Sequence, residues 1–228
     1  MPEHIIIKNS VSELGIAPSD IIEYMSPGEV TDVDYFKAVA AAELEKIKGL
    51  DVLSGYSVFP AYLEGKQLHT RHTAFNIGND FSAILKSVEK IAIFACTVSG
   101  ELNEVLEGST QEDNFLENYI LDIIGTVVIG KAAEKLHERI VSEYASFNVT
   151  NTLSPGNCGW PVEEQAKLLS LLPDGFLNIR LNDSGMMYPV KSLSGIIGIG
   201  ERVRFKQTEC RHCKSRNCPY RKEEYVGI

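Results

Sequence analysis

The sequence contains no long hydrophobic run. No segment approaches the roughly 18 consecutive apolar residues that a membrane-spanning helix needs. The first ten residues, MPEHIIIKNS, lack the basic segment and the long apolar core of a secretory signal peptide. We therefore expect a protein that does not enter a membrane and that stays in the cytoplasm.

Basic residues are scarce relative to acidic ones. Lysine and arginine number 22 against 31 for aspartate and glutamate, which gives a formal net charge of −9. General nucleic-acid binders depend on neutralising phosphates, so this balance argues against a nucleic-acid partner. It is compatible with protein partners or cationic ligands. Apolar residues make up 44% of the 228 positions, enough for the core of one large domain or two small ones.

Helical and extended patterns are mixed along the chain without an internal repeat. Apolar residues recur at helical spacing in segments 33–47 and 112–145. Strands are predicted at 5–7, 52–62, 90–97 and 192–199. Since these elements show no regular β-α-β alternation, we predict an α+β fold with a central, mainly antiparallel or mixed sheet and flanking helices.

Residues 151–200 form the most patterned stretch. Ser154-Pro155-Gly156-Asn157 is a turn sequence ahead of a helix predicted at 161–172. Backbone amides in such a turn could hold a carboxylate or a phosphate at the helix N-terminus. An ordinary loop that leads into a helix is the alternative, which the residues alone favour. We interpret Trp160 as a buried anchor and segment 186–189 as a core strand.

Three of the five cysteines lie close together near the C-terminus. Cys210, Cys213 and Cys218 have the spacing C-x2-C-x4-C, and Cys218 is followed by proline. In a reducing compartment such a cluster favours metal binding over disulfides. The spacing predicts a zinc or iron–sulfur site in a basic tail, 206–228, that follows a domain formed by residues 1–205.

A tetrahedral zinc or a four-iron cluster takes four ligands, so a fourth ligand must come from elsewhere in the chain. Cys158 is the first candidate, ahead of His212 and Cys96. Cys96 lies in the apolar run 90–97 and is interpreted as a core residue. An open fourth position and a reduced, metal-free tail are the alternatives.

Two blocks in the patterned stretch resemble a known family. The first is Pro155-Gly156 with Pro161 and a helix behind it. The second is Leu181-Asn182-Asp183-Ser184, then Met187, Pro189 and Ser192-Leu193-Ser194-Gly195. Both blocks, and the spacing between them, resemble the activation (reactivation) domain of cobalamin-dependent methionine synthase. The motifs cover about 50 residues, and the chain is too short for the other modules of that synthase, so the resemblance is to a stand-alone form.

The resemblance implies an accessory protein that supports repair of a corrinoid partner, and it leaves open whether the chain is itself an enzyme. It implies a C-shaped domain that binds S-adenosylmethionine and docks on the corrinoid-binding module of methionine synthase or a related corrinoid protein. One electron, from a donor protein, and the methyl group of S-adenosylmethionine would return oxidised cobalamin to methylcobalamin.

The resemblance also implies which positions contact S-adenosylmethionine: Thr152, Ser154, Gly156, Asn157, Ile197 and Gly198. Four of the family's contact residues are replaced here. Thr152 stands in place of an arginine, Asn157 in place of a tyrosine, and Ile197-Gly198 in place of an aromatic pair. The alternative is therefore a metal- or iron–sulfur-bearing interaction module that docks on a corrinoid protein without binding S-adenosylmethionine.

Overall fold

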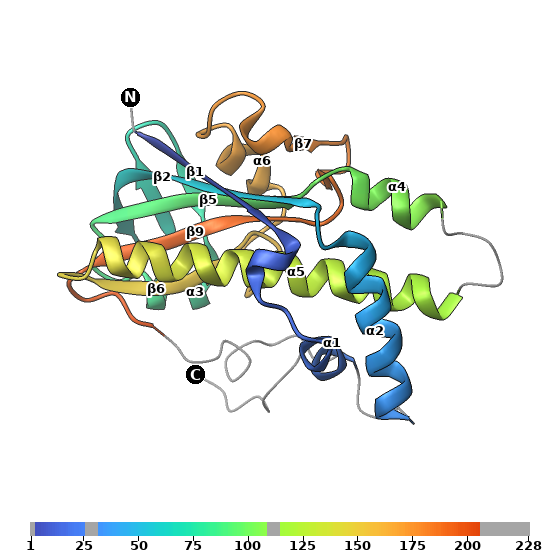
Figure 1. Ribbon diagram of the computed structural model, residues 1–228. Coiled ribbons are helices and arrows are strands. Elements are labelled where there is room, and N and C mark those ends of the chain that lie inside the picture. The colour runs from blue at the N-terminus through green and yellow to red at the C-terminus, as the bar shows by residue number, and fades with distance from the viewer. Residues whose placement is uncertain (1–2, 26–31, 109–114, 206–228) are drawn as a thin grey trace.

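The computed structural model describes residues 3–25, 32–108 and 115–205 (Figure 1). The strands are β1 His4–Ser10, β2 Asp51–Glu64, β3 Gln67–Thr70, β4 Ala74–Asn76, β5 Lys90–Val98, β6 Asn148–Leu153, β7 Arg180–Leu181, β8 Met187–Tyr188 and β9 Ser192–Gly200. The α-helices are α1 Pro18–Tyr24, α2 Val33–Ile47, α3 Gly78–Ile84, α4 Glu101–Gly108, α5 Phe115–Glu143 and α6 Glu164–Leu169. The strands predicted at 5–7, 52–62, 90–97 and 192–199 are confirmed within β1, β2, β5 and β9.

The central sheet has seven strands in the order β4-β3-β2-β5-β9-β6, with β1 pairing with β2 as well. Every described pairing is antiparallel, so the antiparallel form of the prediction is correct. The long strand β2 pairs with β1 through its first half and with β3 through its last residues. The apolar run of β5 lies between β2 and β9 and is buried except at its first residue, as expected for a central strand.

Two hydrophobic cores lie on the two faces of this sheet. One core is formed with α1, α2 and α5, and it contains Phe94 and Cys96 of β5. The other contains Ile91, Ile93 and Ala95 of the same strand. Side chains of a strand point alternately to opposite faces, so β5 contributes to both cores. Helix α5 runs along one side of the sheet (Figure 1).

Two helices begin and end for local reasons. The carboxylate of Asp32 accepts a hydrogen bond from the backbone N–H of Tyr35 at 3.1 Å and so caps α2. The described part of α5 has 29 residues, which corresponds to about 44 Å. The predicted start of this helix at 112 lies outside the described residues. The helix predicted at 161–172 is shorter, at Glu164–Leu169.

The prediction of a core strand at 186–189 is wrong. Strand β8 pairs with β7 in a separate two-stranded sheet. Met186 and Tyr188 are 59% and 42% exposed, and the Arg180 guanidinium lies 5.4 Å from the centre of the Tyr188 ring. A short apolar run does not determine whether it is buried, because its exposure depends on which element of the fold covers it.

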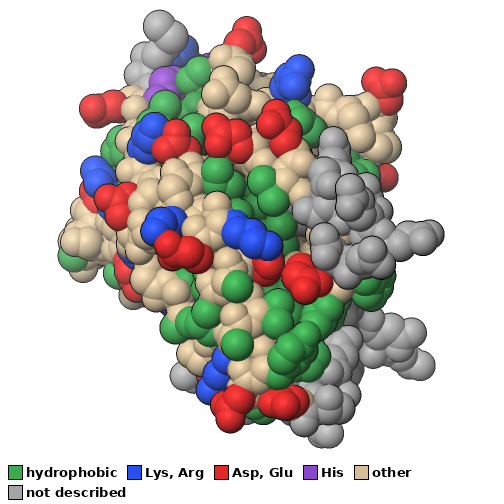
Figure 2. Space-filling view, turned by 45° about the vertical axis from the view of Figure 1, so that its right-hand side comes forward, with side chains coloured by type: hydrophobic (Ala, Val, Ile, Leu, Met, Phe, Trp, Pro, Cys, Tyr) green, Lys and Arg blue, Asp and Glu red, His purple; other side chains and the backbone are tan. Residues whose placement is uncertain are grey.

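Figure 2 shows the side of the molecule that carries α2, α4 and the beginning of α5. Acidic, basic and apolar side chains are interspersed over the coloured part of this face, without a broad basic patch. Among the described residues, no helix is both long enough and apolar enough to cross a membrane.

Candidate functional site

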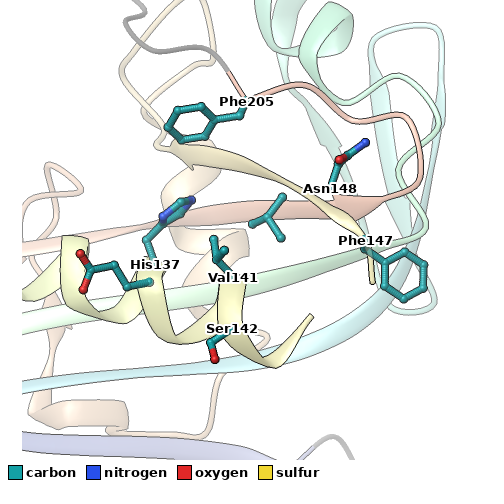
Figure 3. A pocket seen from close by; sticks show the side chains of 8 residues that line it. His137, Val141, Ser142, Phe147, Asn148 and Phe205 are labelled. Atoms are coloured by element: carbon teal, nitrogen blue, oxygen red, sulfur yellow. The ribbon is translucent and has the colours of Figure 1, made fainter. Parts of the chain in front are cut away.

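A groove lies between the C-terminal half of α5 and strand β6 (Figure 3). Its wide lobe, of about 620 Å³, is lined by His137, Glu138, Val141, Ser142, Phe147, Asn148, Val149 and Phe205. Its narrow lobe, of about 290 Å³, adds Gly130, Ala133, Glu134, Asn151, Thr152 and Leu193. The two lobes adjoin because His137 and Phe205 line both.

The groove exists because little side-chain volume fills this part of α5. Gly130 has no side chain, and a Cβ built there would meet no atom within 4 Å. Ala133 adds a single methyl group on the same helix face. Opposite them, β6 ends the sheet and its pairing register with β9 shifts between Val149 and Thr152. Small helix residues therefore face an irregular edge strand across open space.

His137 is held in one orientation. Its Nε2 lies 2.8 Å from the backbone oxygen of Thr150. Since a carbonyl oxygen can only accept, Nε2 carries the hydrogen of this contact. The Thr150 hydroxyl oxygen accepts from the N–H of Gly198 at 2.8 Å, which ties the histidine's partner to β9. The sheet thus fixes an imidazole in the wall of the groove.

Two residues from outside the helix complete the wide lobe. The ring of Phe205 is 59% exposed, and its centre lies 5.9 Å from that of His137 at an angle of 40°. The side-chain amide of Asn148 donates to the backbone oxygen of Glu201 at 2.7 Å, so its oxygen Oδ1 is left as an acceptor. Figure 3 shows His137 projecting from α5 toward Phe205, with Asn148 on the strand side.

Acidic side chains give the groove its charge. Glu138 lines the wide lobe and Glu134 the narrow lobe. The Glu134 carboxylate accepts from Lys131 at 2.5 Å, and this hydrogen bond raises the pKa of Lys131. Aromatic and aliphatic surface with a few polar groups is typical of small-molecule sites. The arrangement suits a small organic molecule.

The structure separates the six residues predicted to contact a cofactor. Thr152 lines the narrow lobe. Ser154 is 9% exposed and lies beside Gly195, where a Cβ would come within 2.8 Å of its hydroxyl. Ile197 is fully buried in the core beneath α5, and Gly198 is buried in the middle of β9. Neither of these two lines the groove, so their proposed contacts would require the packing to open.

The turn 154–157 does not offer its amides to a ligand. The N–H of Gly156 donates to the oxygen of Trp160 at 2.8 Å, and that of Asn157 points to the oxygen of Ser154 at 3.3 Å. The interpretation as an anion cradle is therefore wrong for these two amides, and the simpler interpretation, a loop leading into a helix, is correct. Trp160 is 1% exposed and meets two phenylalanine rings edge-on, which confirms it as a buried anchor.

The second family-like block has a structural explanation. The side-chain oxygen of Asn182 accepts from the N–H of Ser184 at 3.1 Å, from its hydroxyl at 2.8 Å and from the N–H of Met186 at 2.9 Å. These bonds build the turn between β7 and β8. The Ser192 hydroxyl donates to the oxygen of Pro189 at 2.6 Å at the start of β9. The block thus shapes the turn and the strand entry, and it contributes Leu193 to the narrow lobe of the groove.

The predicted metal site is untested by the structure. Cys210, Cys213 and Cys218 lie outside the described residues, and Cys158 is half-buried in the loop after β6. The part of the chain that the structure describes contains no group of three or more metal-binding side chains. Cys96 is fully buried, which raises the pKa of its thiol, so its interpretation as a core residue is confirmed.

The sequence interpretation missed the residues that line the wide lobe, among them His137, Asn148 and Phe205. A signal was nevertheless present, because Gly130, Ala133 and His137 recur at the spacing of one helix face. Small residues followed by a histidine on a helix face are typical of a recessed surface as well as of close packing.

The fold and the groove together define an α+β domain with an antiparallel sheet and a ligand-sized recess at its edge. A solved structure described as the MetH reactivation domain bound to AdoHcy has the same fold, with a TM-score of 0.68. It is 16% identical in sequence, and the match covers 90% of this chain and 81% of that chain. No protein-family model matches the sequence, and no curated protein shows significant similarity to it.

Proposed function

We propose that this protein supports the reactivation of a corrinoid protein, namely methionine synthase or a relative, by holding S-adenosylmethionine for reductive methylation. The observation that carries the proposal is the shared fold, over 90% of the chain, with a reactivation domain that was solved with AdoHcy bound. AdoHcy is what remains of S-adenosylmethionine after the methyl group has left. The two family-like sequence blocks support the same function independently.

The charge of the groove supports a cationic donor. S-Adenosylmethionine carries a positive sulfonium next to the methyl group, and AdoHcy does not. Glu138 places negative charge along the groove, whereas the carboxylate of Glu134 is already paired with Lys131. Exposed charge pairs contribute little, roughly 0–1 kcal/mol each, so Glu138 would favour the donor over its product modestly. Because the groove would prefer S-adenosylmethionine over AdoHcy only modestly, AdoHcy could still dissociate after the methyl transfer.

The proposed reaction balances as follows. An external one-electron donor reduces cob(II)alamin on the partner to the nucleophilic cob(I) state. The cobalt then attacks the methyl carbon, the carbon–sulfur bond breaks, and its electron pair stays on sulfur to give AdoHcy. The protein's own contribution is to position the donor, because holding two reactants together removes much of the entropic barrier.

The test is a reconstitution. An oxidised corrinoid partner, a reductant and S-adenosylmethionine are mixed with and without the protein, and methylcobalamin is followed by absorption. We expect a gain that depends on the protein. Gly130→Leu should abolish most of this gain, because the new side chain would enter the narrow lobe. Gly49→Leu is the matched control, since Gly49 also has open space around it and lies away from the groove.

Three results separate the outcomes. No gain over the reaction without protein would sink the proposal. A gain that survives Gly130→Leu would keep the function and move the donor site elsewhere. A gain lost equally with Gly49→Leu would indicate a folding defect, which thermal unfolding of both variants detects.

A second candidate is a metal- or iron–sulfur-bearing module that docks on a corrinoid protein without binding S-adenosylmethionine. It is favoured by Thr152 in place of an arginine and by Asn157 in place of a tyrosine. The C-terminal cysteines, with Cys158 as fourth ligand, would hold the metal. Tight calorimetric binding of S-adenosylmethionine excludes this candidate. The absorption spectrum and metal content of anaerobically purified protein distinguish a cluster from zinc.

A further inference from the structure

Strand β1 is an edge of the central sheet that the described part of the chain leaves open. It pairs with β2 residue by residue, from His4 opposite Ser57 to Ser10 opposite Asp51, without a bulge. Every second residue of an antiparallel strand turns its backbone N–H and C=O away from that neighbour. Apart from β2, no described group is hydrogen-bonded to the backbone of residues 4–9. The outer side of β1 can therefore pair with a further strand.

The other two edges of the sheet, as far as the structure describes it, are protected against such pairing. Strand β4 has only three residues. Strand β6 has a register shift between Val149 and Thr152, and the backbone oxygen of Thr150 is bonded to His137. Short edge strands and bulges are common devices against the addition of another strand. Strand β1 has neither device and contains no proline, which marks it as the edge suited to pairing.

The side chains of β1 also favour a neighbouring strand. Ile6 is 58% exposed, although it lies in the middle of a run of three isoleucines, whose branched side chains suit strands. A lysine on an edge strand usually discourages pairing. Here the ammonium of Lys8 lies 2.6 Å from the carboxylate of Asp51 in β2, so its charge is balanced within the chain. A strand placed against β1 would cover Ile6 without leaving Lys8 unpaired.

The sequence of β1 is complementary to itself in one register. Two copies that pair antiparallel around a two-fold axis perpendicular to the sheet keep the same faces, so odd residues meet odd ones and even residues meet even ones. When the axis passes at Ile6, Ile6 lies opposite its own copy and Ile5 lies opposite Ile7. All three isoleucines then meet isoleucines, a favourable cross-strand pairing. An axis at Ile5 or Ile7 would instead set Ile6 against His4 or Lys8.

We propose that β1 is a dimerisation edge, where β1 of a second copy of this chain pairs antiparallel with it and the two Ile6 side chains lie opposite each other. Such a contact has two-fold symmetry and joins the two central sheets into one. The pairing uses no residue that lines the groove, which lies at β6, another edge of the sheet. The inference is therefore independent of the proposed function.

The first test measures the mass of the full chain by analytical ultracentrifugation over a series of concentrations. We expect a dimer that dissociates on dilution. Ile6→Lys should raise the dissociation constant at least tenfold, because two like charges would lie opposite each other at the axis. Val162→Lys is the matched control, since Val162 is also exposed, at 47%, and lies outside β1. Thermal unfolding shows whether both variants keep the fold.

The second test examines the register by cross-linking. In Ile6→Cys the two new thiols would face each other across the axis, with about 4.5–5.5 Å between the Cα atoms, which a disulfide can span. Lys8→Cys is the control on the same strand, because its two copies would lie roughly 13 Å apart along the strands. Under mild oxidation we expect a covalent dimer with Ile6→Cys. Lys8→Cys should not exceed the unsubstituted chain, whose own cysteines set the background.

A chain that stays monomeric at every concentration would overturn the proposal, even if β1 accepted a strand from another protein. A dimer that Ile6→Lys leaves intact would overturn it too, because the contact would then lie elsewhere. Equal cross-linking of Ile6→Cys and Lys8→Cys would exclude the register centred on Ile6. Methylcobalamin formation is measured separately and should be unchanged in Ile6→Lys, so the dimer and the reactivation role can each fail without the other.

Discussion

Two glycines of α5 occupy opposite environments. Gly130 faces the groove, where an added Cβ meets no atom within 4 Å. Gly125 packs against the segment before β9, where a Cβ would lie 2.9 Å from Cγ of Lys191 and 3.1 Å from Cδ2 of Leu102. The same residue type therefore keeps a ligand surface open at one position and permits close packing at the other.

Gly130→Ala should stabilise the fold and weaken ligand binding together. Alanine in a helix interior is favoured over glycine by about 1 kcal/mol, which corresponds to a rise of roughly 2–4 °C in Tm for a chain of this size. The new methyl group would narrow the lobe at Thr152. Thermal unfolding and calorimetry with S-adenosylmethionine measure the two effects.

Gly125→Ala is the control in the same helix. Its gain in helix propensity is opposed by overpacking, which costs about 1–3 kcal/mol, so we expect a lower Tm. A rise in Tm for both Gly130→Ala and Gly125→Ala would contradict the close packing assigned to Gly125. A fall in Tm for both variants would contradict the open space assigned to Gly130.

A third glycine explains part of the family-like motif. A Cβ at Gly195 would lie 2.4 Å from the backbone oxygen of Leu153 and 2.9 Å from the ring of Phe94. Only a residue without a side chain allows β6 to approach β9 so closely. The glycine after Ser194 is thus required by packing between strands, and this is a reason for the motif that does not involve a ligand.

At the scale of elements, a polar contact to β2 ties the last residue of α5 to the sheet. The hydroxyl of Tyr56 in β2 donates to the carboxylate of Glu143, the last residue of α5. Tyr56 is 1% exposed, and burial, followed by this hydrogen bond, raises its pKa from 10.0 to about 12. Tyr144, beside the same carboxylate, also has a raised pKa, mainly through burial.

This contact predicts alkaline lability. Folded Tyr56 holds its proton more tightly than the unfolded chain does, so its contribution is complete below pH 10 and is lost as the pH rises toward 12. The loss amounts to about 2–3 kcal/mol over that window. Denaturant titrations at a series of pH values measure it.

Tyr56→Phe should cost about 1–3 kcal/mol at neutral pH, because a buried hydrogen bond to a carboxylate is removed. It should also flatten the decline above pH 10. Tyr144→Phe is the control, since Tyr144 is only half-buried and should change the profile less. An unchanged slope in Tyr56→Phe would show that other groups control alkaline unfolding.

At the scale of the whole molecule, the buried core residues that the structure describes run from Val11 to Val203. Helices α1, α2 and α5 cover one face of the sheet. Helices α3 and α6 and the loops beside them cover the other face. The groove lies on the helical side, whereas Cys158 packs against the other core. A metal site that used Cys158 would therefore lie on the face of the sheet opposite to the groove.

This organisation predicts that a chain ending at Phe205 unfolds at the same temperature as the full chain when metal is absent. Added zinc or a reconstituted cluster should raise the Tm of the full chain, because a ligand that binds the folded state stabilises it by mass action. The shortened chain should not respond, and Cys158→Ser should reduce the response. Failure of the shortened chain to fold would contradict a domain boundary at 205.

The sequence alone determined the elements whose signals are local. The alternation and apolar runs of β2, β5 and β9, the Asp32 cap of α2 and the burial of Cys96 and Trp160 follow from residues that are neighbours in the chain. The family-like blocks also identified the fold, because turns such as that of Asn182 and close approaches such as that of Gly195 require particular residues at fixed positions.

The tertiary structure decided where a ligand could lie. The groove brings Gly130 and His137 of one helix against Thr152 and Asn148 of a distant strand, and Phe205 lines both of its lobes. It also buries Ile197 and Gly198, exposes Tyr188, and uses the amides of Gly156 and Asn157 within their own loop. Local patterns cannot predict such features, because the exposure of a side chain depends on which remote segment packs against it.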